Sequence, residues 1–446
     1  MRAYLQGTAA IDLSTITAAE AASIRDELTL TQRGYTSGDT PTPFWMEYGD
    51  GWLHVPKGWL LARPQFAHAL SVTDGRSDGR PLPEGTRAHV NFGEHPFPSG
   101  QPQAIADAVR TARTNGHGGL FLAPTRSGKS LMSLEVACRL GGSTLVLVND
   151  VDLLRQFHRD VTESIKAPCG VIRGKEFNWR EPFTVATVQT LARRILDPEI
   201  RNAWRTVLID ECNMAPCDTI WSVLSRINAR YVFGLTATPD RSDGLNDAIR
   251  WIIGPPAASL ERKLEADVHW LSHPWTFDGS IKRGKYTDIV KAEKAVAGDI
   301  SRVNRLAESA VGAVAAGRTV LMMVHMLDHA AALADAVARL GVTPGVFVGG
   351  ASDAEMRRKV VIATYKKAAK GIDFKPPPTC FIPAGPIRDI RQAVGRALQP
   401  QVPHRTLIVH PVDLHGPLIK WAAACADYYT ECGFTFRNSM PGRWAA

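Results

Sequence analysis

Apolar residues in the middle of the chain occur in short continuous runs, and amphipathic stretches separate these runs. Five runs between about residues 118 and 254 have the length of buried strands: 120–122, 144–148, 183–186, 206–209 and 231–235. Helical stretches begin near Lys129 and Asp152, after the first two runs. Continuous apolar strands that alternate with helices are typical of a parallel sheet covered on both faces. This region is therefore predicted to form an α/β domain.

The same alternation resumes near residue 318. Runs that read as buried strands and a helix lie at 319–324, 359–363, 406–409 and 329–340. The pattern predicts two tandem parallel-sheet domains, at residues 96–255 and 287–446, the second with a C-terminal helical tail. Residues 256–286 between them are predicted to be a linker or hinge.

The first 95 residues have a different pattern. Aromatic and β-branched residues from Phe44 to Ala62 are interspersed with Gly and Pro, and residues 35–43 and 73–84 are rich in turn formers. Short strands are expected in such a segment. Residues 1–95 are therefore predicted to form a small α+β accessory domain and a candidate nucleic-acid-binding module.

Composition limits the class of protein. A chain of 446 residues is too long for one ordinary core, and its 45% hydrophobic and 22% charged residues are those of a globular protein. No apolar run approaches the roughly 18 residues of a membrane span, and the first residues lack the apolar core of a signal peptide. The seven cysteines form no CxxC pair. We expect a cytoplasmic protein with reduced thiols and no membrane partner.

The positive charge is concentrated in the C-terminal part. The net charge is +8, and from residue 271 onward 23 Lys and Arg stand against 14 Asp and Glu. The densest stretch, 357–375, holds seven basic residues and one acid. Such a cluster suits the phosphate backbone of nucleic acid, with a solvated surface face as the alternative.

Residues 123–130, Ala-Pro-Thr-Arg-Ser-Gly-Lys-Ser, run from a predicted strand into a predicted helix. In a phosphate-binding loop, backbone N–H groups at a helix N-terminus point at the anion, which excludes side chains near Gly128. Lys129 can reach the β- and γ-phosphates and the Ser130 hydroxyl can bind Mg²⁺. The first position is Ala123 instead of the usual glycine, and a surface turn is the alternative interpretation.

Asp210 and Glu211 follow the predicted strand at 206–209 directly. Ligands bind at the carboxyl ends of strands in open α/β sheets. Asp210 can hold Mg²⁺ through water, and Glu211 can polarise the water that attacks the γ-phosphate. An acidic pair that caps the next helix is the alternative.

These motifs, in this order, resemble those of superfamily 2 helicases, in the form found in UvsW-like phage helicases, XPB-type repair helicases and the related type III restriction (ResIII) group. The resemblance covers about residues 97–410 and implies two RecA-like domains. The segments that resemble the Q motif and motifs Ia, Ib, II, III, V and VI are 101–105, 145–156, 185–191, 210–213, 234–244, 362–373 and 392–399.

The resemblance implies ATP and Mg²⁺ as cofactors and a role for residues in each motif. Its catalytic residues would be Lys129, Asp210, Glu211, Gln392 and Arg396. Its nucleotide-binding residues would be Gln101, Thr125, Ser127, Gly128, Lys129, Ser130 and Asp373, with Ser130 and Asp210 at Mg²⁺. Nucleic acid would contact Thr187, Gln189, Thr364, Lys366 and Lys367. Residues that couple the two sites would be Asn213, Thr236 and Thr238.

Three positions depart from the family pattern. Arg126 replaces a glycine of the phosphate loop, and Asn213 replaces the usual histidine. Gln399 replaces the second arginine of motif VI, a finger that can contribute roughly 10³–10⁵-fold to hydrolysis. Arg396 remains, and Arg391 or Arg405 could substitute for the finger in space.

The sequence therefore predicts an ATP-dependent helicase or translocase that acts on DNA in preference to RNA, in recombination, repair or replication. A protein partner in a replication or recombination complex is expected, with localisation at the nucleoid through DNA. The alternative is a nucleic-acid-binding regulatory protein whose ATPase is degenerate or partner-dependent, on the evidence of Gln399. A third hypothesis is the motor subunit of a restriction assembly, whose nuclease would be a separate subunit because residues 1–95 and 411–446 hold no convincing nuclease constellation.

Overall fold

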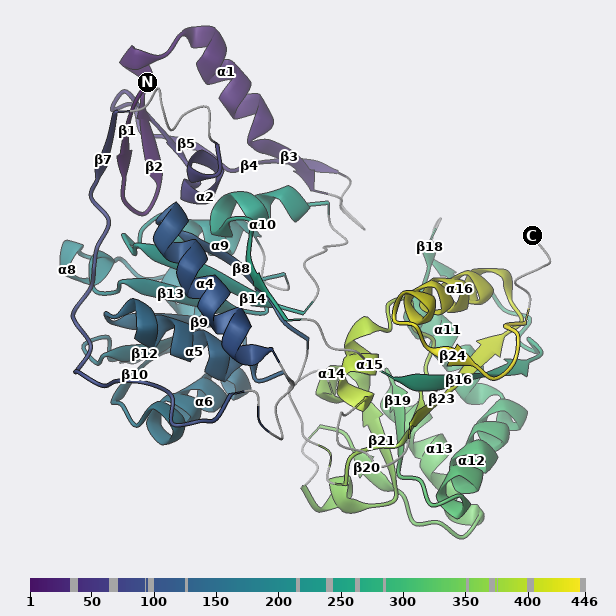
Figure 1. Ribbon diagram of the computed structural model, residues 1–446. Coiled ribbons are helices and arrows are strands. Elements are labelled where there is room, and N and C mark those ends of the chain that lie inside the picture. The colour runs from purple at the N-terminus through teal and green to yellow at the C-terminus, as the bar shows by residue number, and fades with distance from the viewer. Residues whose placement is uncertain are drawn as a thin grey trace. The chain divides into compact units, whose positions relative to one another are not determined.

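Three large sheets organise the part of the chain that the computed structural model describes. One unit, Met1–Glu261, holds a five-stranded and an eight-stranded sheet, and a second unit, Arg262–Ala446, holds a seven-stranded sheet (Figure 1). The described residues are 1–32, 39–63, 71–92, 94, 100–124, 127–213, 217–237, 244–260, 265–283, 286–349, 353–368, 374, 376–398 and 405–441. Among the described helices, none combines the length and the apolar character that crossing a membrane requires.

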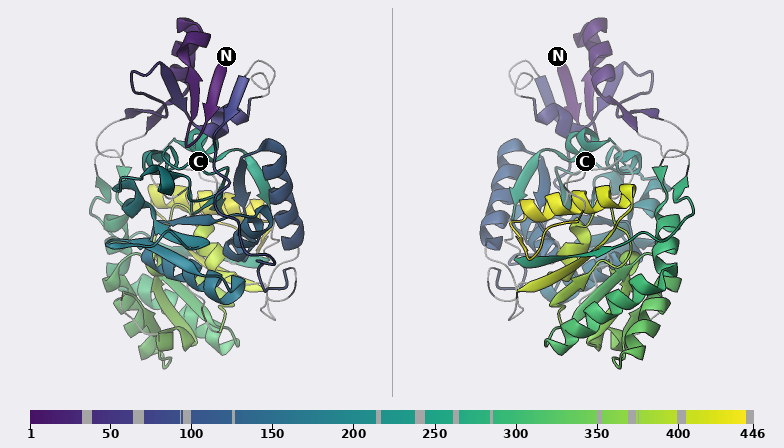
Figure 2. Two further views of the ribbon diagram at one scale, coloured as in Figure 1. Left: turned by 90° about the vertical axis from the view of Figure 1, so that its left-hand side faces the viewer. Right: turned by 90° about the vertical axis from the view of Figure 1, so that its right-hand side faces the viewer.

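The N-terminal module is a five-stranded sheet with helices beside it. Its strands, in spatial order, are β5 (Met46–Glu47), β6 (Trp52–Val55), β2 (Ala9–Asp12), β1 (Arg2–Leu5) and β7 (Ser71–Asp74). The helices are α1 (Ala18–Glu27) and α2 (Lys57–Leu61), and a hairpin joins β3 (Thr29–Gln32) to β4 (Thr40–Pro43). Thr17 and Glu20 form a capping box that starts α1. Figure 2 shows this module at one end of its unit.

The N-terminal module is docked tightly on the eight-stranded domain of the same unit. Gly7, in the β1–β2 turn, donates its N–H to Asn228 Oδ1 at 2.9 Å. A Cβ at Gly7 would lie 2.1 Å from the Ser225 carbonyl oxygen, so only glycine fits there. Buried Lys57 donates to the Ala229 carbonyl at 2.9 Å. Residues 1–95 are therefore part of the first compact unit and not a separate body.

The eight-stranded sheet is parallel apart from the β10–β11 pair. In spatial order its strands are β11 (Glu176–Phe177), β10 (Cys169–Arg173), β12 (Phe183–Thr187), β9 (Thr144–Val148), β13 (Thr206–Asp210), β14 (Tyr231–Thr236), β8 (Gly118–Leu122) and β15 (Pro256–Ser259). The five strands predicted from apolar runs are confirmed. Strand β10 was missed because only alternate residues of it are buried, so it has no continuous apolar run.

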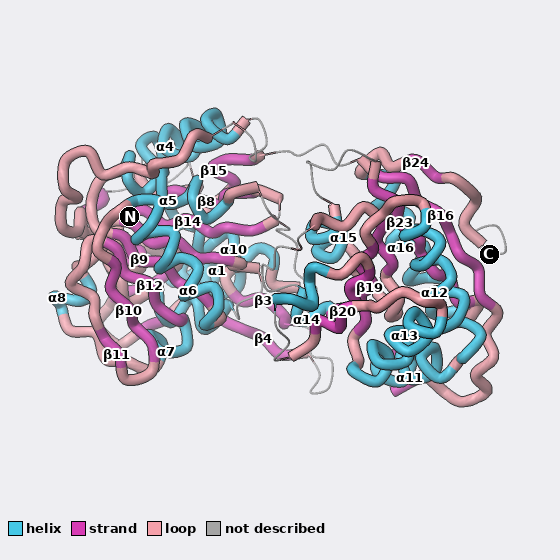
Figure 3. The backbone as a smooth tube through the Cα atoms, turned by 90° about the horizontal axis from the view of Figure 1, so that it is seen from below, coloured by secondary structure: helices cyan, strands magenta, loops and turns pink. Residues whose placement is uncertain are grey.

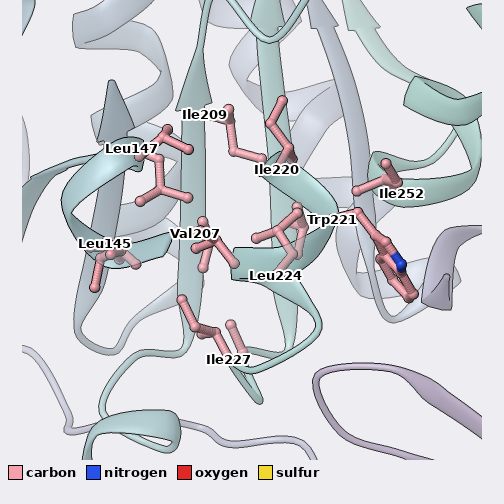
Figure 4. Packing of buried hydrophobic residues seen from close by; sticks show 14 of the residues in the cluster. Leu145, Leu147, Val207, Ile209, Ile220, Trp221, Leu224, Ile227 and Ile252 are labelled. Carbon is pink, nitrogen blue, oxygen red and sulfur yellow. The ribbon is translucent and has the colours of Figure 1, made fainter. Parts of the chain in front are cut away.

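Helices cover both faces of this sheet. They are α4 (Gln101–Asn115), α5 (Lys129–Leu140), α6 (Val151–Arg159), α7 (Val188–Ala192), α8 (Pro198–Arg201), α9 (Cys217–Leu224) and α10 (Asn246–Ile253). Alternate residues of one strand face opposite sides, so Val207 packs with α9 and α10 while Leu208 packs with α4 and α5. Figure 4 shows the first face, where Val207 and Ile209 lie beside Ile220 and Leu224 of α9.

The second unit holds a seven-stranded, wholly parallel sheet. Its strands, in spatial order, are β20 (Gly345–Phe347), β21 (Val360–Thr364), β19 (Val320–Val324), β22 (Cys380–Ile382), β23 (Thr406–Asp413), β16 (Ala266–His273) and β24 (Thr435–Phe436). Its helices are α11 (Ile289–Gly298), α12 (Ile300–Ala315), α13 (Leu327–Arg339), α14 (Tyr365–Ala368), α15 (Arg391–Ala397) and α16 (Gly416–Glu431). A hairpin joins β17 (Lys282–Arg283) to β18 (Tyr286–Thr287). Helices α12 and α13 pack on one face of the sheet, and α15 and α16 on the other (Figure 3).

The predicted linker at 256–286 is wrong for two of its segments. Residues 256–259 form β15, which pairs with β8, and residues 266–273 form β16, which pairs with β23 along its whole length. Ala266, Val268 and Trp270 are buried while the residues between them are half-buried, a period of two that predicts a strand. The C-terminal tail is likewise part of the domain, because α16 buries one face and β24 pairs with β16.

Candidate nucleotide and nucleic-acid sites

The phosphate loop lies between β8 and α5, as predicted. Gly128 is the N-cap of α5 and has φ 76°, in the left-handed region that glycine adopts without steric cost. Lys129 and Ser130 begin the helix, and the Lys129 side chain is largely buried. The free N–H groups of this helix end therefore stand beside a lysine and a hydroxyl. Thr125 and Arg126 lie outside the described residues.

The acidic pair follows β13 and meets the loop. Asp210 ends the strand and is buried, and Glu211 adopts φ 46°, which is unusual for a residue with a Cβ. Lys129 Nζ lies 3.3 Å from Glu211 Oε1, although 82 residues separate them in sequence. Both are brought there by strands β8 and β13, which run parallel and end at the same edge of the sheet. Backbone strain of this kind is concentrated at functional sites.

Backbone hydrogen bonds join the three motifs at this edge. Ala123, at the start of the loop, donates its N–H to the Thr236 carbonyl at the end of β14, at 3.0 Å. Cys212 donates its N–H to the Leu235 carbonyl at 3.2 Å. Thr236 and Asn213 are both buried, and Thr238 lies outside the described residues. Of the residues predicted to couple the two sites, Thr236 is thus tied to the loop through a main-chain hydrogen bond.

Cys212 fills the space beneath the acidic pair as an apolar group. It is fully buried, and burial raises the pKa of its thiol to about 12. A Cβ at Gly234 would lie 2.9 Å from its Sγ, so the glycine of β14 makes room for it. A neutral thiol adds no negative charge beside Asp210 and Glu211.

Two glutamines support the loop. Gln101 is fully buried and donates its side-chain amide to the Ser127 carbonyl. Its predicted contact with adenine stays a prediction. Gln156 Nε2 lies 3.5 Å from Ser130 Oγ, a contact that the sequence analysis did not predict. The signal available was the helical spacing that puts Leu154 and Phe157 inward on α6, beside the loop helix.

The donor set of this site fits a magnesium nucleotide. Ser127 Oγ is buried and has no hydrogen-bond partner among the described residues, and a polar ligand would supply that partner. A lysine, a loop of N–H groups and a helix N-terminus suit phosphates, and a hydroxyl with a carboxylate suits Mg²⁺. The residues in question are Ser127, Gly128, Lys129, Ser130 and Asp210.

The predicted nucleic-acid contacts of the first unit lie at the same edge. Thr187 ends β12 and its Oγ1 lies 2.7 Å from Thr190 Oγ1, so it is held by its own helix turn. Gln189 is exposed on α7. Its amide is therefore open to a ligand while the threonine has a structural partner.

In the second unit, residues 365–368 of the basic stretch form the short helix α14. Thr364 ends β21, and its Oγ1 accepts the Lys367 N–H at 3.2 Å. Lys366 is exposed, whereas the Lys367 ammonium lies 5.1 Å from the centre of the Phe347 ring. Gln392 and Arg396 are four residues apart in α15. Asp373 and Gln399 lie outside the described residues.

Comparisons with known proteins agree with this geometry. Residues 94–241 match the family model described as "Type III restriction enzyme, res subunit". Over 353 residues the chain is 24% identical to protein L396 of Acanthamoeba polyphaga mimivirus, named as a candidate ATP-dependent RNA helicase, covering 74% of this chain and 66% of that one. Over 138 residues it is 28% identical to the DNA 3'-5' translocase XPB2 of Sulfurisphaera tokodaii, covering 31% and 30%. The family model matches residues 94–241 only, and these two relatives are named as a helicase and a translocase.

Solved structures show the same fold. A fragment of a candidate HsdR subunit of a type I restriction enzyme from Vibrio vulnificus matches with a TM-score of 0.51 and 16% identity, over 70% of this chain and 63% of that one. The two parallel sheets therefore have the fold of tandem RecA-like domains. The chain spans less than two thirds of the length of each curated relative named above.

Proposed function

We propose that this protein is an ATP-dependent helicase or translocase that acts on nucleic acid. The observation that supports it most directly is the meeting of Lys129 and Glu211 at the edge of a parallel sheet, 3.3 Å apart. Residues from two distant segments converge there beside a glycine turn whose backbone N–H groups a ligand can approach closely. If the loop were an ordinary surface turn and Glu211 only capped a helix, no contact between Lys129 and Glu211 would be expected.

Within this proposal, the first unit holds ATP and Mg²⁺. Lys129 and the N–H groups that follow Gly128 bind the phosphates, and Ser130 and Asp210 hold the metal, directly or through water. Glu211 orients the attacking water, and its unusual backbone fixes the carboxylate in place. The metal supplies charge neutralisation on the phosphate oxygens.

The second unit supplies the groups that sense the nucleotide and grip the nucleic acid. Arg396 and Gln392 on α15 act on the phosphates, with Asp373 as a further nucleotide contact. Thr364, Lys366 and Lys367 bind the backbone, with Thr187 and Gln189 in the first unit. Contacts of this kind are insensitive to base sequence and weaken as salt rises.

DNA is the proposed substrate, in recombination, repair or replication. The two curated relatives differ on this point, since one is named as an RNA helicase and the other as a DNA translocase. The segment 234–244 has the Leu-Thr-Ala-Thr-Pro-Asp-Arg-Ser-Asp-Gly form that resembles phage and XPB-type DNA helicases. Turnover measured with single-stranded DNA, duplex DNA, forked DNA and RNA separates the alternatives.

The decisive variant is Lys129→Ala. We expect at least a hundredfold loss of nucleic-acid-stimulated ATP hydrolysis, because the phosphate charge loses its partner (about 10²-fold or more for a lost charge contact in the transition state). Lys175→Ala removes an exposed lysine from the same unit and is the matched control. Equal turnover in Lys129→Ala and wild type would overturn the proposal.

A second candidate is a regulatory nucleic-acid-binding protein whose ATPase needs a partner. Gln399 in place of the arginine finger favours it. The discriminating variant is Gln399→Arg. If wild type binds DNA but hydrolyses ATP only after this substitution, the regulatory protein is the better description, whereas rapid turnover by wild type excludes it.

A further inference from the structure

The loop between β22 and α15 in the second unit is held in an unusual way. Its residues 384, 385 and 386 present three consecutive backbone carbonyls, and a side chain from a different element donates to each. Main-chain bonds of the loop to the described residues run from Ala384 N to the Ile382 carbonyl and from Gly385 N to the Met323 carbonyl, both at 2.9 Å. This segment is called the clamped loop below, and it leads directly into the helix that carries Gln392 and Arg396.

Two of the three donors are anchored by buried acids. Arg302 donates to the Ala384 carbonyl at 3.0 Å and is paired with Asp413 at 2.6 and 3.1 Å. His325 Nε2 lies 2.8 Å from the Pro386 carbonyl, and the backbone N–H of His325 donates to Glu293 at 2.7 Å. These two donors are therefore fixed by the core of the unit.

Glu293 is the anchor on the His325 side. Its Oε1 accepts from the N–H groups of His325 and Met326 and from His329 Nδ1, at 2.7 to 3.1 Å. Burial opposes the charged carboxylate, yet these donors hold the pKa of Glu293 below its ordinary value. Burial also lowers the pKa of His329, so a neutral imidazole donates to a charged carboxylate.

The third donor is Tyr365, whose hydroxyl donates to the Gly385 carbonyl at 3.1 Å. Its ring lies against His325, with ring centres 4.5 Å apart. Burial raises the pKa of Tyr365 well above its ordinary value, so the hydroxyl keeps its proton. Tyr365 is the first residue of α14, between Thr364 and Lys366, which are the proposed nucleic-acid contacts.

We infer that Tyr365 is a positioning residue that makes the placement of the clamped loop, and with it of α15, depend on nucleic acid bound at α14. This inference rests on the proposed function. Arg302 and His325 hold the loop whatever is bound, whereas Tyr365 moves with the segment that grips the backbone. Helix α14 also packs against α15, so a shift of one bears on the other. A larger side chain at Gly385 would be crowded, because a Cβ there would lie 3.1 Å from Glu293 Oε2 and from Val324 Cα.

The test is Tyr365→Phe in the full chain, which removes one oxygen atom and keeps the ring. ATP turnover is measured without nucleic acid and with saturating DNA, and DNA affinity by fluorescence anisotropy. We expect the ratio of stimulated to basal turnover to fall about fivefold, the effect of one lost hydrogen bond on a coupling equilibrium. Basal turnover and DNA affinity should stay within about twofold of wild type. Tyr48→Phe, at an exposed tyrosine of the first unit, is the control and should change none of the three.

Three outcomes are informative. An unchanged ratio in Tyr365→Phe would overturn the inference and leave the proposed function standing. A parallel fall of basal turnover, stimulated turnover and thermal stability would show a structural role only, and would also overturn it. A wild-type protein that hydrolyses ATP at the same rate with and without any nucleic acid would instead overturn the proposed function.

Discussion

The phosphate loop of the first unit and the clamped loop of the second are both turns between a strand and a helix, but they are supported differently. The phosphate loop is joined to β14 by a main-chain bond, from Ala123 N to the Thr236 carbonyl, and one side chain, that of Gln101, donates to a carbonyl of the loop. The clamped loop is held by the side chains of Arg302, His325 and Tyr365. A main-chain support survives most substitutions, whereas a side-chain support can be removed by one.

The difference suits the work proposed for each loop. A phosphate loop must present fixed N–H groups to an anion, and a rigid backbone does so without reorganisation. If the position of a loop depends on bound nucleic acid, one of the side chains that hold it must be able to move while the others stay in place. Three predictions test this difference between the two loops and the other side-chain support of the fold.

Of the substitutions considered, removal of the Arg302 side chain that holds the clamped loop should cost the most stability. Arg302 and Asp413 are both buried, and Arg302→Ala leaves the carboxylate without its partner. We expect a loss of about 3–5 kcal/mol in the free energy of unfolding, the usual result of breaking one side of a buried ion pair. Urea denaturation measures it. Arg305→Ala, at an exposed arginine on the same helix, should cost less than about 1 kcal/mol, and equal losses would refute the argument.

The N-terminal module is also held by a side chain on a carbonyl, through Lys57 and Ala229. Burial lowers the pKa of Lys57 to about 7. The unfolded chain therefore binds more protons than the folded one between about pH 7 and the ordinary lysine pKa, so stability rises with pH in this window. We expect a gain of about 2 kcal/mol from pH 7 to pH 9 attributable to this group.

Lys57→Met is the variant that isolates this effect. This variant should raise the free energy of unfolding at pH 7. It should also remove the part of the increase in stability between pH 7 and pH 9 that comes from Lys57. Urea denaturation at both pH values measures the two effects. A wild-type curve that is flat over this range, or that matches the variant, would show that Lys57 titrates normally.

The phosphate loop is best tested by substituting the two glycines that flank α5. Gly128 and Gly141 have φ 76° and 68°, so alanine at either should cost about 1 kcal/mol of stability. A Cβ at Gly141 meets no atom within 4 Å. We expect only Gly128→Ala to abolish binding of a fluorescent ATP analogue. Binding by Gly128→Ala at wild-type affinity would mean that the nucleotide does not approach this backbone.

Several features of this protein could be determined from the sequence alone. Continuous apolar runs identified β8, β9, β12, β13 and β14 of the first sheet and β19, β21 and β23 of the second, because strands buried on both faces leave no polar positions. Strand β22, between β19 and β23, was missed. The order of the motifs predicted the tandem RecA-like fold, and the phosphate loop and acidic pair were predicted at strand ends that the structure confirms. These features are local, since each is encoded by fewer than a dozen neighbouring residues.

Other features depend on which strands lie side by side. The pairing of Lys129 with Glu211 joins residues far apart in sequence, and so do the bonds of Arg302 and Tyr365 to the clamped loop. Strands β15 and β16 were predicted as linker because their apolar residues are few or alternate, and only the neighbouring strands supply the rest of their environment. Sequence pattern specifies the conformation of a segment, whereas contacts between segments follow from the order of strands in a sheet, which no single segment encodes.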